Sequence, residues 1–272
     1  MILLSPAKIN IGLRITHRRS DGFHNLQSVM YPVGLCDVIE IREAEPGAQA
    51  LIFSMSGIPV QEGSGKNLCE KAHEIFSEVR VIPPVEIHLH KQIPVGAGLG
   101  GGSSNATQIL KGLNRLTANP LTPESLHDMA ARLGSDCPFF LHDHAMMIEG
   151  RGEILSPSPV TLEGLWLVLL FPEIHISTAE AYSGVTPVRP GRHLDQLVAA
   201  PVQQWRETVV NDFESGIFAK YPELASHRET LYKAGAIYAS LSGSGSSLYG
   251  IFTERPGLPA SVSRYVIWEG RT

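Results

Sequence analysis

The chain has 272 residues, of which 43% are hydrophobic and 18% charged, so it can bury a substantial core and is not a disordered protein. Its formal net charge of −5 argues against broad binding to nucleic acid or to an anionic membrane surface. Its three cysteines lie far apart without a CxxC pair, which argues against a disulfide framework or a zinc–thiolate site and favours a reducing compartment.

No run of apolar residues reaches the ~18 residues that a membrane-spanning helix needs. The N-terminal ten residues contain a short apolar run without a basic leader, so they do not resemble a signal peptide. We therefore expect a cytoplasmic protein that has neither a membrane nor a nucleic-acid partner.

The alternation of residue types predicts a strand near the N-terminus. Residues 9, 11, 13 and 15 are isoleucine or leucine, and they alternate with Lys8, Asn10, Gly12 and Arg14. A period of two places alternate side chains on opposite faces, so one face of the strand is expected to be buried. Lys8 and Asn10 therefore share the other face.

Apolar spacing predicts the other elements of the first half. Strands are expected over residues 38–42, 50–54 and 85–90, and helices over residues 67–80 and around residues 109–116. An N-cap, a proline and an acid at residues 122–124 open a further helix that ends near Leu133, with Gly134 as its cap. A hairpin is expected from residues 145–149 and 153–155 around the glycine-rich turn 150–152.

The second half continues this mixture of elements. Strands are expected over residues 165–171, 237–241, 248–252 and 265–268, and helices over residues 178–182, 212–218, 223–233 and 259–264. The proline- and serine-rich stretch 156–162 indicates a boundary between domains at residues 1–156 and 157–272. Because strands and helices do not alternate strictly, we expect an α+β fold.

Residues 94–104 form the most informative stretch of the chain. Five glycines occur within the seven residues 96–102, between a predicted strand and a predicted helix. Glycine tolerates positive φ and lets a ligand approach the backbone closely. A helix that begins after such a loop presents free N–H groups and the positive end of its dipole. The stretch is therefore a candidate phosphate-binding loop.

Several known glycine loops do not fit this stretch. No Lys-Ser or Lys-Thr follows the last glycine, as a Walker A motif requires. The partial G-x-G-x-x-G match lacks the strand–helix unit and the acid of a dinucleotide site, and the motifs of protein kinases are missing. A second glycine loop, at residues 241–247, is by itself equally well explained as a hairpin turn. Together the two loops suggest two backbone walls around one ligand.

Two further residues are candidates for chemistry. Asp136 follows a capped helix and lies two residues before a proline, where it can be an ordinary N-cap of the segment 139–141, an ionised catalytic base, or both. Lys8 is either a solvated lysine or a functional one. The eleven histidines show no ligand spacing, and neither serine of the first loop lies in a GxSxG elbow, so metal and serine-hydrolase sites are not expected.

These motifs together resemble the GHMP kinases, the small-molecule kinases of the galactokinase, homoserine kinase and mevalonate kinase superfamily. Three of its motifs occur in order: PAKIN at residues 6–10, the P-x-G-x-G-L-G-type loop at residues 94–104, and the late Ser-Gly-Ser-Gly loop. The extended GLGGGSS loop and the DGFH box at residues 21–24 are similar to one branch of that superfamily. That branch phosphorylates a cytidyl diphosphate sugar alcohol of the non-mevalonate isoprenoid pathway.

The resemblance implies a two-domain fold with an N-terminal ribosomal-S5-like domain, a C-terminal ferredoxin-like domain and an active site between them. It implies ATP-dependent phosphorylation of the 2-hydroxyl of 4-diphosphocytidyl-2-C-methyl-D-erythritol, with ATP and Mg²⁺ as cofactors. A monomer or weak homodimer is expected. The alternatives are another GHMP kinase, acting on homoserine or phosphomevalonate, or an inactive nucleotide-binding regulator on the same fold.

The resemblance also implies roles for individual residues. Asp136 matches the catalytic base and Lys8 the catalytic lysine. The ATP loop comprises Pro94, Val95, Gly96, Ala97, Gly98, Leu99, Gly100, Gly101, Gly102, Ser103 and Ser104. The residues expected to bind the substrate are Asn10, Phe23, His24 and Tyr182. Either Ser103 or Ser104 is a candidate for contact with Mg²⁺. Phe23 departs from the tyrosine of many relatives, which puts a hydroxyl hydrogen bond in doubt but not base stacking.

Overall fold

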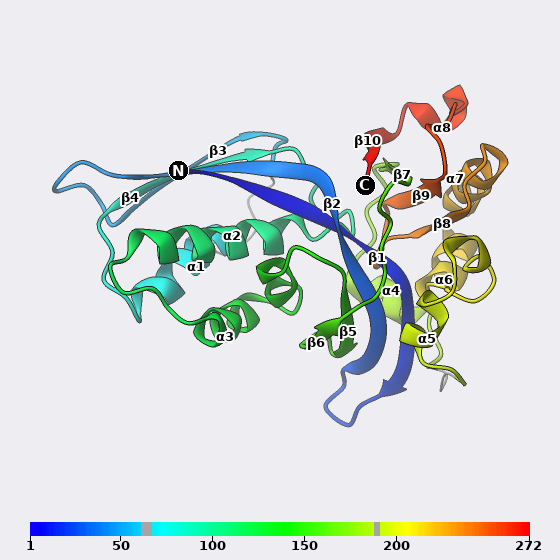
Figure 1. Ribbon diagram of the computed structural model, residues 1–272, viewed down its shortest axis with the longest axis horizontal. Helices are drawn as coiled ribbons and strands as arrows, with labels where there is room; N and C mark the ends of the chain where they lie inside the picture. Colours follow the sequence, from blue (N-terminus) through cyan, green and yellow to red (C-terminus); the bar gives the residue numbers. More distant parts are fainter. Residues whose placement is uncertain (61–66, 188–190) are drawn as a thin grey trace. The chain divides into compact units, whose positions relative to one another are not determined.

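The computed structural model describes residues 1–60, 67–187 and 191–272 (Figure 1). The chain gathers into two compact units. The first unit contains Met1–Ala7, Leu35–Val95 and Gly100–Asp143, and the second contains Lys8–Gly34, Gly96–Leu99 and His144–Thr272. Each unit is built from segments that are separate in the sequence, whereas the sequence analysis expects two consecutive domains, residues 1–156 and 157–272. The division into units does not test a boundary between residues 156 and 157, which therefore stays a prediction.

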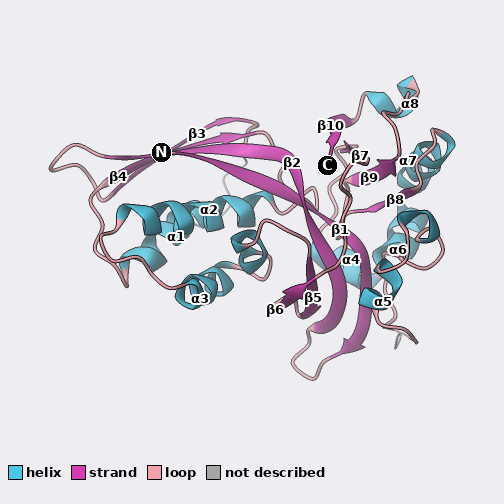
Figure 2. Ribbon diagram, viewed as in Figure 1, coloured by secondary structure: helices cyan, strands magenta, loops and turns pink. Residues whose placement is uncertain are grey.

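In the first unit, three helices lie on one side of a small sheet (Figures 1 and 2). Strand β4 (Val85–Lys91) pairs in parallel with β3 (Leu51–Gly57) and antiparallel with the second half of β2 (His24–Glu43). The helices are α1 (Leu68–Ser77), α2 (Gly101–Leu116) and α3 (Pro123–Leu133), and a short 3₁₀ helix, η1 (Cys137–Leu141), follows them. The predicted α+β content is confirmed.

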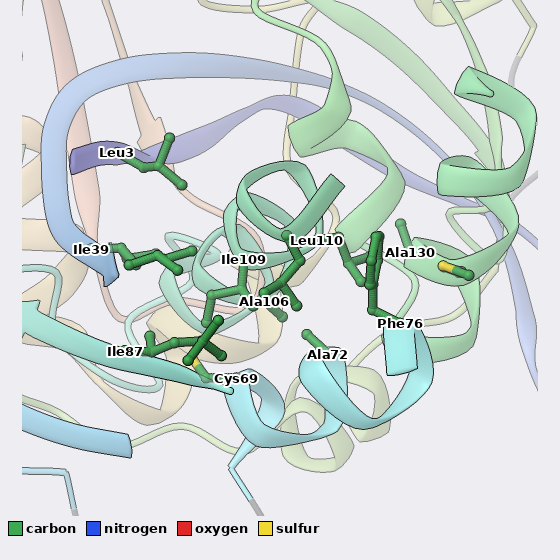
Figure 3. Packing of buried hydrophobic residues seen from close by; sticks show 14 of the residues in the cluster. Leu3, Ile39, Cys69, Ala72, Phe76, Ile87, Ala106, Ile109, Leu110 and Ala130 are labelled. Atoms are coloured by element: carbon green, nitrogen blue, oxygen red, sulfur yellow. The ribbon is translucent and has the colours of Figure 1, made fainter. Parts of the chain in front are cut away.

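The core of the first unit is built from apolar residues that recur every two positions in the strands and every three or four positions in the helices. Ile39 and Ile87 point from the strands toward Phe76 of α1 and Ile109 and Leu110 of α2 (Figure 3). All five side chains are at most 1% exposed. The strands contribute alternate residues and the helices contribute residues three and four apart, which is why the spacing alone predicted these elements.

Local capping sets the helix ends in the first unit. The side chain of Asn67 caps α1 and forms a capping box with Glu70. Thr122 caps α3 and accepts a 3.3 Å hydrogen bond from the backbone N–H of Ser125, as the sequence predicted. Gly134 does end α3, but its φ of 171° is extended backbone, so this position does not depend on the freedom of glycine.

The second unit contains a four-stranded antiparallel sheet in the order β10 (Val266–Arg271), β7 (Trp166–Leu170), β9 (Leu248–Phe252) and β8 (Tyr238–Leu241). Its longer helices are α6 (Phe213–Lys220) and α7 (Pro222–Lys233), and the shorter ones are α4 (Thr178–Ser183) and α8 (Ala260–Ser263). The predicted hairpin is present as β5 (Met146–Gly150) and β6 (Ile154–Pro157), and β5 also pairs with the first half of β2.

The structure corrects three expectations. Strand β1 (Ile2–Arg18) is buried on both faces from residue 7 to residue 13, not on one face. Strand β2 begins at His24, well before the predicted start at residue 38, because residues 26–30 of its first half pair with β5. Short helical segments that the sequence did not predict are α5 (Leu194–Val198) and the 3₁₀ turn η2 (Val202–Gln204). Among the described residues, no helix has the length and apolar character needed to cross a membrane.

An ion cluster in the second unit predicts a pH dependence of stability. His193, at the N-cap of α5, is hydrogen bonded to Glu149 of β5 at 3.0 Å and to Asp195 of α5 at 2.7 Å. Partial burial disfavours its charged ring, but the two carboxylates outweigh this and raise the pKa of His193 above 6.5. Its stabilising contribution is thus complete below pH 6.5 and is lost as the pH rises through the folded-state pKa.

We therefore expect His193→Gln to lower the Tm more at pH 6 than at pH 8.5. Thermal unfolding of both proteins across this range measures the difference. An equal loss of Tm at the two pH values would show that the charge on His193 does not stabilise the fold.

Candidate functional site

Lys8 is buried in the second unit. Its side chain is 4% exposed, which excludes the alternative of a solvated lysine. The Nζ atom donates to Asn10 Oδ1 at 2.6 Å and to the carbonyl oxygen of Gly98 at 3.0 Å. The backbone N–H of Lys8 donates to the carbonyl oxygen of Leu99 at 2.9 Å. A buried charge must be hydrogen bonded to be tolerated, so these contacts hold the ammonium group against the first glycine loop.

Asn10 lies beside Lys8 on the same face of β1, as predicted. Its Nδ2 group donates to Ser28 Oγ at 2.8 Å, and Ser28 in turn donates to the carbonyl oxygen of Gly12 at 2.7 Å. This chain fixes the orientation of the amide and aims Oδ1 at Lys8. Each end of the amide makes one hydrogen bond inside the protein, so contact with a substrate would use the second lone pair of Oδ1 or the second N–H of Nδ2.

The second glycine loop, between β8 and β9, touches the first one. Ser242 Oγ donates to the carbonyl oxygen of Gly98 at 3.0 Å, and the Ser247 N–H donates to that of Ala97 at 3.2 Å. A Cβ added to Gly243 would lie 3.1 Å from Asn10 Oδ1. The two glycine loops are therefore in direct contact near Gly98, next to Lys8, and the prediction that they enclose one ligand stays a prediction.

Two buried residues that sequence reasoning missed support the second loop. Asn211 Nδ2 donates to the carbonyl oxygens of Leu241 and Gly243, both at 2.9 Å. Glu214 Oε1 accepts from the backbone N–H of Leu241 and from Ser240 Oγ, both at 2.8 Å. Burial raises the pKa of Glu214 although it accepts these hydrogen bonds. Only contacts between distant segments reveal these roles, and the sequence carries no local signal for them.

The first glycine loop uses the conformational freedom of its glycines. Gly96, Gly98 and Gly100 have φ angles of 69°, 77° and 71°. Gly100 is the N-cap of α2, and it has no side chain that could occupy the N–H groups of the first turn. Those groups and the helix dipole are what an anion-binding loop needs.

The two serines of this loop have different surroundings in the first unit. Ser104 is fully buried and accepts a 2.8 Å hydrogen bond from Ser5 Oγ. Ser103 is half-buried, and its interaction with the thiol of Cys137 lowers the pKa of that thiol without cancelling the effect of burial. Burial raises the pKa of that thiol to about 11, so it stays neutral. Of the two serines, only Ser103 is partly exposed.

Asp136 lies in the first unit, directly before η1. It is half-buried, and its neighbour Cys137 is fully buried. The carbonyl oxygen of Cys137 accepts a 2.9 Å hydrogen bond from Thr107 Oγ1, which ties this segment to α2. Asp136 does occupy the N-cap position of η1, but within the described residues its side chain makes no capping hydrogen bond to that helix.

The structure brings together only some of the expected substrate residues. His24 stacks on Tyr182 with ring centroids 4.9 Å apart and an interplanar angle of 21°. Tyr182 also contacts Phe213 edge to face at 5.0 Å. Phe23 is 56% exposed, and the guanidinium of Arg151 lies 5.2 Å from its ring centroid. Arg151, seen in the sequence only as part of a turn, therefore lies beside Phe23.

Within residues 1–60, 67–187 and 191–272, no three His, Cys, Asp or Glu side chains come together to hold a metal ion. A divalent cation at this site would therefore depend on ligands supplied by a bound nucleotide and by single hydroxyl or carboxylate groups.

Comparison with known proteins gives a consistent result. Residues 67–144 match the GHMP kinases N terminal domain, and residues 199–266 match the GHMP kinases C terminal family. The 4-diphosphocytidyl-2-C-methyl-D-erythritol kinase of Bacteroides thetaiotaomicron is 41% identical, covering 95% of this chain and 94% of its own. The kinase of the same name from Parabacteroides distasonis is 40% identical, covering 100% of this chain and 99% of its own.

Solved structures agree. A crystal structure of 4-(cytidine 5'-diphospho)-2C-methyl-D-erythritol kinase is 32% identical, covers 92% of this chain and 90% of its own, and has a TM-score of 0.79. A homoserine kinase from Cytophaga hutchinsonii shares the fold, with a TM-score of 0.65, 16% identity and coverage of 92% and 86%. The resemblance expected from the motifs is confirmed. The chain belongs to the GHMP kinases, a group of small-molecule kinases, and within it to the 4-diphosphocytidyl-2-C-methyl-D-erythritol kinase family.

Proposed function

We propose that this protein transfers the γ-phosphoryl group of ATP to the 2-hydroxyl of 4-diphosphocytidyl-2-C-methyl-D-erythritol. The main support is the identity of about two residues in five with kinases of that name over nearly the whole chain. The geometry of the second unit agrees with it, because a buried lysine lies where two glycine loops meet. The product would be the 2-phosphate, in the non-mevalonate route to isoprenoid precursors.

In this reaction Asp136 accepts the proton of the attacking hydroxyl. An alcohol is a poor nucleophile, so a positioned base accelerates its attack. The Lys8 ammonium stabilises the negative charge that develops on the oxygen. The hydrogen bonds from Lys8 to Asn10 and Gly98 hold that ammonium in place, so that little reorganisation is needed during the reaction.

The nucleotide phosphates bind residues 94–104 through backbone N–H groups and the N-terminus of α2. Mg²⁺ retains several waters and contacts substrate phosphates, so one protein hydroxyl suffices on the protein side. Ser103 fits this part, since the residue is partly exposed, whereas Ser104 is buried and accepts a hydrogen bond from Ser5. When bound, the cation neutralises charge on the phosphates.

Phe23, His24 and Tyr182 bind the cytosine base by stacking and through the edge of the imidazole. Phe23→Ala is expected to raise KM for the cytidyl substrate by about 5- to 160-fold, as base–aromatic stacking is worth ~1–3 kcal/mol. Because the base is remote from the reacting hydroxyl, kcat should fall much less. Steady-state kinetics at saturating ATP measures both. Val81→Ala, a truncation at an exposed position of the first unit, is the control and should leave KM unchanged.

The decisive experiment is a substrate panel with ATP and Mg²⁺, in which ³¹P NMR identifies the phosphorylated position. Turnover of the cytidyl compound at its 2-hydroxyl supports the proposal. Turnover of homoserine or phosphomevalonate alone would identify a different GHMP kinase. ATP binding without transfer to any substrate would identify an inactive regulator.

A further inference from the structure

A buried ion pair lies in the first unit, apart from the residues assigned to catalysis. Lys91 and Asp37 form this pair, and their side chains are only 4% and 0% exposed. The Lys91 ammonium also donates to Asn105 Oδ1 at 3.1 Å. Buried ion pairs commonly add little stability compared with apolar residues of the same volume. The contacts of this pair therefore suggest a purpose other than stability.

Asp37 holds the chain where it enters the ATP loop. Its Oδ1 atom accepts hydrogen bonds from the backbone N–H groups of Gln92 and Ile93, at 2.6 and 2.8 Å. These two residues immediately precede residue 94 of the loop. One carboxylate oxygen thus sets the direction in which the loop begins.

Asn105 holds the chain where it leaves the loop, in the second turn of α2. Its Nδ2 group donates to Asp37 Oδ2 at 2.8 Å and to Ser5 Oγ at 2.9 Å. Ser5 Oγ in turn donates to Ser104 Oγ, the last loop residue. A Cβ added to Gly101 would lie 2.9 Å from Ile93 Cγ2 and 3.2 Å from Lys91 Nζ. The entry and exit of the loop therefore meet on this network.

Near the start of α2, the charges of Asp37 and Lys91 compensate each other. An unpaired Asp37 carboxylate close to the first turns of α2 would repel phosphate, and an unpaired ammonium would oppose the positive end of the helix dipole. As a neutral pair, they do not cancel the attraction of the loop N–H groups for an anion.

We propose that Asp37, Lys91 and Asn105 are positioning residues that clamp both ends of the ATP loop and hold it in its phosphate-binding shape. This inference rests on the proposed function, in which residues 94–104 bind ATP. The clamp residues need not touch the nucleotide. They act through the backbone at Gln92 and Ile93 and through the start of α2.

The test is calorimetric titration of each folded protein with a non-hydrolysable ATP analogue and, separately, with the cytidyl substrate. Lys91→Met leaves the Asp37 charge uncompensated and should weaken analogue binding at least about tenfold, with substrate binding changed less than about twofold. The double variant Asp37→Asn with Lys91→Met removes both charges together and should recover part of that loss. A double variant as weak as Lys91→Met would overturn the role of charge compensation.

Asn105→Ala provides a second test that leaves the ion pair in place. It can be carried out even if Lys91→Met does not fold. It should weaken analogue binding about three- to tenfold through the lost hydrogen bonds. Leu113→Ala is its matched control, a fully buried core position on the same helix that makes no part of the clamp. It should lower the Tm but leave analogue affinity within about twofold. Equal analogue affinity of Asn105→Ala and wild type would refute the clamp, whereas a wild-type protein that binds no analogue would refute the proposed function.

Discussion

Asp136→Asn is expected to lower kcat by about 10²- to 10⁴-fold, the range that a general base contributes. The amide has the size of the carboxylate but cannot take the proton of the attacking hydroxyl. The backbone around it is held by the buried Cys137 and by the hydrogen bond from Thr107, so the substitution should not disturb the fold. Single-turnover kinetics measures the loss, and calorimetry should find the affinity for the ATP analogue nearly unchanged.

Asp128→Asn is the matched control for this variant. Asp128 is also a carboxylate of the first unit, but its side chain is 87% exposed on α3. It should keep wild-type turnover. If Asp136→Asn also kept near-normal turnover, the base would have to be another group, and the assignment carried over from the family motif would fail.

The predictions from sequence succeeded where the cause is local. The cap at Thr122 and the apolar spacing of α1 and α3 depend on residues a few positions apart, and the structure confirms these elements. The first glycine loop was equally visible, because positive φ at Gly96, Gly98 and Gly100 is a requirement of its own backbone.

The sequence could not reveal what distant segments do to one another. The surface that covers Lys8 comes from Gly98, 90 positions away, so nothing near Lys8 separates a buried lysine from a solvated one. The same limit applies to Asn211 and to the pair Asp37–Lys91, whose partners lie about 30 and 54 positions away. Their polar side chains resemble ordinary surface residues until the fold brings their partners to them.

For the stacking of His24 on Tyr182, the residues could be predicted from the sequence but their contact could not. The family resemblance named both residues, but their contact and the guanidinium of Arg151 beside Phe23 come only from the structure. The resemblance to a family predicts which residues have a role, whereas the packing of this chain determines which residues contact them.

Gly98→Ala is the second variant for which we expect a large loss, with kcat/KM reduced at least about 10²-fold, as a misplacement of about 1 Å at a reacting group can cost. An added Cβ would overlap the carbonyl oxygen of Ser242 and lie 3.1 Å from that of Gly245. Both neighbours are backbone, which cannot rotate away as a side chain does. The loops must then separate, and the carbonyl oxygen of Gly98 moves away from the Lys8 ammonium and Ser242 Oγ, each now 3.0 Å from it.

The variant Gly47→Ala distinguishes the effect of this atomic overlap from the effect of the backbone strain that a positive φ causes. Gly47 has a φ of 86°, close to the 77° of Gly98, but a Cβ there would meet no described atom within 4 Å. It should lose stability by the strain alone and keep the kcat/KM of the wild type. If Gly98→Ala behaved like Gly47→Ala in steady-state kinetics, contact between the two glycine loops would not be required for phosphoryl transfer. A selective loss in Gly98→Ala would instead show that the second loop acts by holding the first against Lys8.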